Sequence, residues 1–91
     1  METIIIEHHF EDRPFDIDRY SDAQRTNAWC LETHRVRHVV SYVTPDARRM
    51  ICVFEAPDAE AVRRTASELG YKYDRLWPAT IVRRPTTSCC D

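Results

Sequence analysis

The sequence predicts an α+β domain in which an antiparallel sheet carries two helices on one face. The clearest evidence lies in residues 50–70, where a short apolar run at 51–54 is typical of a buried strand. Pro57 ends this strand because proline has no amide hydrogen to donate to a sheet. A capped amphipathic helix follows at once, and the rest of the chain repeats this alternation of strands and helices.

The N-terminal third predicts one strand and one helix. Three consecutive isoleucines precede Glu7-His8-His9-Phe10, so we expect an interior strand over residues 3–10 with a polar end. A helix is expected over residues 22–34 because Ser21 and Gln24 have the spacing of a capping box, with apolar residues following at helical intervals.

A hairpin is expected next. Residues 37–44 and 48–55 are rich in β-branched and aromatic side chains, and Pro45-Asp46-Ala47 between them favours a turn.

The last helix and strand follow the hairpin. Asp58 is a good N-cap for a helix over residues 58–69, and Gly70 can take the left-handed conformation that closes its C-terminus. Residues 76–82 predict a final strand, which Pro78 places at the edge of the sheet.

The resulting order, strand-helix-strand-strand-helix-strand, is that of the ferredoxin-like βαββαβ fold. This fold would occupy residues 1–84, with 85–91 as a flexible tail. Because both helices lie on one face, the other face is open, and a chain of 91 residues buries only a modest share of its surface. We therefore expect a homodimer, a dimeric α+β barrel, with a cavity between the two sheets.

Composition excludes several classes of protein. No apolar run approaches the ~20 residues of a membrane helix, and Met1 to Phe10 does not resemble a signal peptide, so we expect a cytoplasmic protein with reduced cysteines and no membrane partner. The single glycine, Gly70, excludes a Gly-rich phosphate loop and with it a nucleotide cofactor. The sequence has no basic stripe interleaved with aromatic residues, so we do not expect it to bind nucleic acid.

Strand alternation predicts which side chains point to the open face. A carboxylate is rarely buried under helices, so Glu55 is assigned to the open face, and Cys52 and Phe54 to the helix side. The same counting, applied to the other strands, places these residues on the open face: Ile5, Glu7, His9, His38, Val40, Tyr42, Ile51 and Val53.

These assignments gather possible metal ligands on one surface. Imidazole binds nickel, copper and zinc well, and carboxylates can complete the shell. The predicted ligands are Glu7, His9, His38 and Glu55, and a small ligand in the same cavity would contact Tyr42, Val40 and Val53. The alternative interpretation is that these polar groups are solvated strand ends or dimer contacts.

Two other functions stay open from the residues alone. A cofactor-independent enzyme of the monooxygenase or isomerase kind could use His9, His38, Glu55 and Tyr42 as acids and bases, although nothing indicates a nucleophilic mechanism. A structural or regulatory interaction module is the third possibility.

Residues 38–46, 50–63 and 74–79 together resemble a family of small bacterial proteins of unassigned function that includes a nickel-binding member. The resemblance covers roughly residues 3 to 82 and implies a ferredoxin-like fold that dimerises. It also implies a metal site, because Glu7 and His9 match an acidic residue and a histidine near the end of the first strand of the nickel-binding relative. That relative has histidines near the end of its second helix, where this chain has Thr65 and Tyr71.

Overall fold

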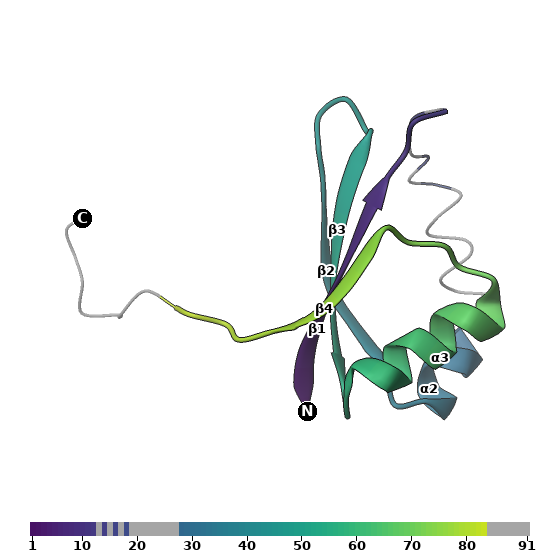
Figure 1. The fold of residues 1–91 in the computed structure, drawn as a ribbon, viewed down its shortest axis with the longest axis vertical. Helices are drawn as coiled ribbons and strands as arrows, with labels where there is room; N and C mark the ends of the chain where they lie inside the picture. The colour runs from purple at the N-terminus through teal and green to yellow at the C-terminus, as the bar shows by residue number, and fades with distance from the viewer. Residues whose placement is uncertain (13, 15, 17, 19–27, 84–91) are drawn as a thin grey trace.

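In the part of the chain that the structure describes, a four-stranded antiparallel sheet has two helices on one side (Figure 1). The computed structural model describes residues 1–12, 14, 16, 18 and 28–83. The strands lie in the order β2-β3-β1-β4, so the α+β class predicted from the sequence is confirmed. The elements are β1 (Glu2–His9), α2 (Ala28–Thr33), β2 (Arg37–Val43), β3 (Arg49–Ala56), α3 (Ala59–Leu69) and β4 (Arg75–Ala79).

The core lies between the sheet and the helices. Strands β1 and β3 are the two central strands, and Ile6 of β1 stands opposite Cys52 of β3. Both side chains are fully buried, as the sequence predicts for Cys52. The other members of this core are Ile4, Val36, Met50, Phe54, Ala56 and Val62.

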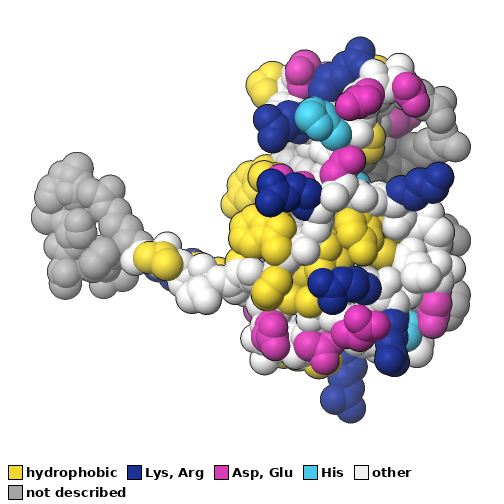
Figure 2. All heavy atoms as spheres, viewed as in Figure 1, with side chains coloured by type: hydrophobic (Ala, Val, Ile, Leu, Met, Phe, Trp, Pro, Cys, Tyr) yellow, Lys and Arg dark blue, Asp and Glu magenta, His cyan; other side chains and the backbone are white. Residues whose placement is uncertain are grey.

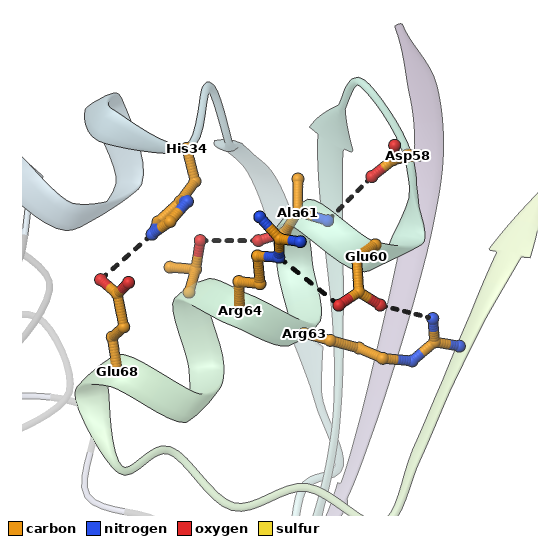
Figure 3. A network of polar contacts seen from close by, with 8 residues as sticks. His34, Asp58, Glu60, Ala61, Arg63, Arg64 and Glu68 are labelled. Carbon is orange, nitrogen blue, oxygen red and sulfur yellow. Dashed lines mark hydrogen bonds and ion pairs between the residues drawn. The ribbon is translucent and has the colours of Figure 1, made fainter.

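Helix α3 begins and ends where its capping residues predict. Asp58 accepts a hydrogen bond from the backbone N–H of Ala61 at 2.8 Å, which satisfies a donor that the first turn leaves unpaired (Figure 3). Gly70 has a φ of 66°, the left-handed conformation that closes the helix. The predicted helix at 58–69 is therefore confirmed to within one residue.

A side-chain contact joins the end of helix α2 to α3. His34, which follows the last turn of α2, lies with its Nε2 3.1 Å from the carboxylate of Glu68 on α3 (Figure 3). Only residues 28–33 of the helix expected at 22–34 can be compared, because its predicted start lies outside the described residues, as does the predicted tail at 85–91. Among the residues described, no helix has both the length and the apolar character needed to cross a bilayer.

Strand β4 is shorter than predicted. We expect a strand over residues 76–82, but β4 ends at Ala79, opposite Thr3. Strand β1 begins one residue before Thr3, so it offers little further backbone with which the chain could pair. The segment that follows leaves the body of the domain on the side away from the helices (Figure 1).

A β-bulge in β2 overturns one predicted orientation. The pairing of β2 with β3 shifts between His38 and Val40, so that His38 stands opposite Phe54 and Val40 opposite Val53. Phe54 faces the helices, and the rings of His38 and Phe54 are 5.3 Å apart. The open-face position predicted for His38 is wrong, because simple alternation holds only in an unbroken strand and the extra residue at the bulge reverses the face.

Candidate functional site

The side of the sheet away from the helices has an apolar centre. Ile5 of β1 stands between Val53 of β3 and Trp77 of β4, and Val40 of β2 extends the same row. Directly opposite residues in antiparallel strands share a face, so these four side chains form one surface. We call this side of the sheet the open face.

Glu7 carries the carboxylate at one end of this surface. It stands between Ile51 of β3 and Arg75 of β4. The indole N–H of Trp77 donates to Glu7 Oε2 at 2.7 Å, and Arg75 Nε lies 4.0 Å from the same oxygen. Two neighbouring side chains therefore orient the carboxylate before any ligand arrives.

His9 lies beyond Glu7 at the end of β1. Its backbone N–H donates to Asp74 Oδ2 at 2.6 Å, while the backbone N–H of Asp74 donates to the carbonyl of Glu7 at 2.9 Å. These two bonds fasten the end of β1 to the residue before β4. Because the side chains of Glu7 and His9 alternate with that of His8, they share the open face about 7 Å apart along the strand.

A groove of about 480 Å³ runs across this end of the sheet. The carboxylates of Glu7 and Asp74 and the guanidinium groups of Arg49 and Arg75 lie along it, so its charges are mixed. Tyr42 adds an exposed aromatic ring from β2. The groove thus combines two carboxylates, the imidazole of His9, two cations and an aromatic surface.

The structure brings together only two of the four predicted metal ligands. Glu55 lies four residues from the partner of Glu7 along β3, a separation of about 13 Å. Its carboxylate accepts hydrogen bonds from Arg37 instead, at 2.9 Å from Nε and also from Nη2. Glu7 and His9 therefore form the pair, and Glu55 belongs to the opposite end of the open face.

His38 is separated from this pair by the sheet itself. Its Nε2 lies 2.8 Å from the hydroxyl of Ser41, which in turn lies 3.1 Å from the thiol of Cys52, on the side of the helices. Along β3, the residues opposite His9 and His38 are five positions apart, about 16 Å. Within the described part of the chain, no three His, Cys, Asp or Glu side chains are grouped closely enough to hold a metal ion.

The predicted ligand-contacting residues are divided in the same way. Tyr42, Val40 and Val53 all belong to the open face by register, as expected. Tyr42 lines the groove, whereas Val40 and Val53 lie in the apolar row beside it.

Sequence analysis missed the contributions of Asp74 and Trp77. Both act through the pairing of β1 with β4, which joins segments about 70 residues apart. One rule predicts their position: in an antiparallel pair, the end of one strand lies beside the start of the other. That rule puts Asp74 and Arg75 next to Glu7 and His9.

The two histidines on the helix side are shifted toward their neutral form. Burial lowers the pKa of His8, with a hydrogen bond to the backbone of Lys72 and the charge of Asp74 acting in the opposite direction. Burial also lowers the pKa of His38, opposed by a hydrogen bond to the backbone of Val40. His8 packs its ring 4.9 Å from that of Tyr71, and alternation along β1 places it on the face opposite to His9.

Comparison with known proteins gives two findings. Residues 5–78 match the model of a family described as nickel responsive protein, SCO4226-like. The fold resembles the crystal structure of SCO4226 from Streptomyces coelicolor A3(2), with a TM-score of 0.74 and 20% identity over 89% of this chain and 99% of that one. No curated protein matches the sequence. Because the family model spans most of the chain, this protein belongs to the SCO4226-like family of nickel-responsive proteins.

Proposed function

We propose that this protein binds a divalent metal ion, nickel in the first place, at the end of the open face where Glu7 and His9 lie. The observation that carries the proposal is the paired placement of one carboxylate and one imidazole on the same face, with the carboxylate already oriented by Trp77 at 2.7 Å. Ligands held by outer hydrogen bonds are typical of metal sites. The family description, which names a response to nickel, supports the choice of metal.

Glu7 and His9 fit such an ion chemically, but two donors are too few to hold it. Imidazole suits nickel, and a carboxylate oxygen of Glu7 is left over after the bond to Trp77. We propose that a second copy of the chain supplies further ligands, since a twofold axis that passes close to Glu7 and His9 would bring a second Glu7 and His9 to the site. The ion would then be shared between two copies.

The proposed pairing is supported by the character of the open face. Tyr42 is 65% exposed, and Val40, Ile51 and Trp77 on the same face are exposed as well. A continuous apolar surface of this kind is typical of an interaction site. We therefore infer a ferredoxin-like domain, consistent with the order β2-β3-β1-β4, that pairs through its sheet into an α+β barrel.

Isothermal titration of untagged, chelator-free protein with Ni²⁺, Zn²⁺ and Cu²⁺ tests the metal site. We expect the double variant Glu7→Gln, His9→Ala to bind Ni²⁺ more than about tenfold more weakly, since loss of even an outer-shell partner costs about 10–100-fold. Gln keeps a hydrogen-bond acceptor for Trp77 while it removes the charge of Glu7.

A matched control comes from the two predicted ligands that the structure separates from this pair. The double variant His38→Ala, Glu55→Gln also removes one imidazole and one carboxylate, and we expect its nickel affinity to equal that of the wild type. Equal affinities in the Glu7, His9 variant and the wild type would refute the proposed site. A loss in the His38, Glu55 variant alone would move the site elsewhere.

A small organic ligand is the second candidate, because the groove has the volume typical of ligand sites. Mass spectrometry of the native protein would detect a ligand that is retained on purification. A bound ligand that contacts Tyr42 would also favour an enzyme that uses this cavity. The cytoplasmic location stays a prediction.

A further inference from the structure

The groove around Glu7 and His9 has balanced charges as long as no cation occupies it. Among the described residues, the charged side chains that line it are Glu7, Asp74, Arg49 and Arg75. Two acidic and two basic groups cancel, so a divalent ion bound there leaves a surplus of two positive charges. The surplus is the same when two copies share one ion, because the side chains of each groove cancel one another.

The two cations of the groove flank the proposed metal ligands from both sides. Arg49 on β3 stands opposite His9, and Arg75 on β4 stands opposite Glu7. Because β3 and β4 are the two neighbours of β1, two strand spacings of together about 10 Å separate the two arginines across the sheet. In the space-filling view, acidic, basic and histidine side chains are intermixed at the end of the body where β1 ends (Figure 2).

Binding of a metal ion removes the counter-charge of these arginines. Arg75 Nε lies 4.0 Å from Glu7 Oε2, the carboxylate that we assign to the ion. The guanidinium of Arg49 has no hydrogen-bonding or ion-pair partner among the described residues, and Arg49 is exposed. The metal-bound groove therefore presents two guanidinium groups without full neutralisation, and such groups bind carboxylates through paired hydrogen bonds.

Apolar neighbours indicate that the missing anion is organic. Ile51 stands beside Glu7 on the open face, and Tyr42 stands on the other side of Ile51. Both side chains are exposed and can cover a short methylene chain. An inorganic dianion has no apolar part to use this surface. Carboxylate oxygens are in addition suitable ligands for a divalent metal ion.

We propose that the metal-loaded groove binds a small dicarboxylate, whose two carboxylates pair with Arg49 and Arg75. This inference rests on the metal site proposed above. The metal supplies the charge that the dicarboxylate neutralises, so each ligand strengthens the binding of the other by the same factor. The protein then takes up its metal together with an organic acid rather than as the hydrated ion alone.

Isothermal titration with Ni²⁺, with and without succinate at constant ionic strength, tests the coupling. We expect succinate to strengthen Ni²⁺ binding at least about fivefold, the lower end of typical couplings between ligands. In the reverse titration, nickel-loaded protein should bind succinate more tightly than metal-free protein by the same factor. Sulfate has the same charge without methylene groups, and acetate has a single carboxylate, so both should have a smaller effect.

Two arginine variants show where the dicarboxylate binds. The double variant Arg49→Gln, Arg75→Gln should lose the effect of succinate. Without succinate it should bind Ni²⁺ at least about threefold more tightly, because two nearby positive charges are gone. A damaged groove would instead weaken Ni²⁺ binding in both buffers. Arg37→Gln is the matched control, since Arg37 pairs with Glu55 at the opposite end of the open face, and it should show the full effect.

The possible failures can be told apart. Chelation of Ni²⁺ by succinate in solution is common to all the proteins, so the comparison between variants cancels it. Equal Ni²⁺ affinity of the wild type and of the double variant in their response to succinate would overturn the dicarboxylate site and leave the metal site standing. An equal effect of sulfate or acetate would also overturn it. Nickel binding that is indifferent to Glu7→Gln, His9→Ala would refute the metal site and this inference together.

Discussion

The indole N–H of Trp77 on β4 donates to the carboxylate of Glu7 on β1 across a distance of 2.7 Å. The two residues are 70 positions apart in the sequence, and only the pairing of β1 with β4 brings them together. The bond sets the direction of the carboxylate that we assign to the metal. Trp77 is thus a positioning residue for the proposed site.

Replacing Trp77 with Phe should weaken nickel binding while the fold is kept. Phe keeps an aromatic ring on the open face but removes the donor that orients Glu7, and outer-shell losses cost about tenfold or more in affinity. Isothermal titration measures the change, and Tyr42→Phe, another change of one polar group on the same face, serves as the control. Sedimentation of both variants must show the wild-type oligomeric state. Equal nickel affinity in Trp77→Phe and the wild type would show that the hydrogen bond from Trp77 to Glu7 does not contribute to nickel binding.

Ile6→Ala and Ile51→Ala should differ sharply, because the two residues lie on opposite sides of the sheet. Ile6 is 1% exposed in the core, so its truncation should lower the free energy of unfolding by about 2–5 kcal/mol. Ile51 is 40% exposed in a single copy, and its truncation should cost less than about 1 kcal/mol where monomers dominate. Urea unfolding at low and high protein concentration measures both, and the cost at Ile51 should rise with concentration. A concentration-independent cost there would contradict the pairing of open faces.

Asp58→Ala should destabilise the protein by about 1 kcal/mol through loss of the helix cap. The side chain accepts from the backbone N–H of Ala61 at 2.8 Å, and Ala leaves that donor without a side-chain partner. Asp58→Asn keeps an acceptor and should stay close to the wild type. Urea denaturation of the three proteins decides the matter, and a loss as large in Asn as in Ala would assign the effect to charge rather than to capping.

Acidification should destabilise the folded protein through His38. Burial lowers the pKa of His38 below its ordinary value of 6.5, so the unfolded chain takes up its proton first as the pH falls. The associated stability is fully present above that ordinary value and is lost as the pH falls through the lowered pKa. His38→Gln should flatten the dependence of the free energy of unfolding on pH between about 7.5 and 5, as measured in urea at each pH. An unchanged slope would show that other groups cause the dependence.

Local signals in the sequence predict which helices and strands form, whereas pairing between distant segments determines where a strand such as β4 ends. Asp58 and Gly70 define both ends of α3 because caps depend on residues within one turn. The end of β4 depends on where β1 begins, about 75 positions earlier, and no signal near Val82 reports it. That is why the predicted strand extends three residues beyond the end of β4.

The candidate site is likewise predictable only where it depends on local pattern. Alternation within β1 is enough to place Glu7 and His9 on one face, since the strand is regular. The bulge before Val40 has no residue signature of its own in this chain, so alternation alone predicts the wrong face for His38. The contacts of Trp77 and Asp74 with β1 depend on the register in which β1 pairs with β4. The order of the elements along the chain does not determine that register.

The bond between Trp77 and Glu7 also makes tryptophan fluorescence a measure of metal binding at Glu7. The sequence contains only two tryptophans, Trp29 and Trp77, so a substantial part of the intrinsic fluorescence comes from an indole tied to the carboxylate in question. A cation that binds the carboxylate of Glu7 changes the surroundings of the indole. The fluorescence of the unlabelled protein should therefore change as the metal site fills. The variant Trp29→Phe would leave Trp77 as the source of the tryptophan emission.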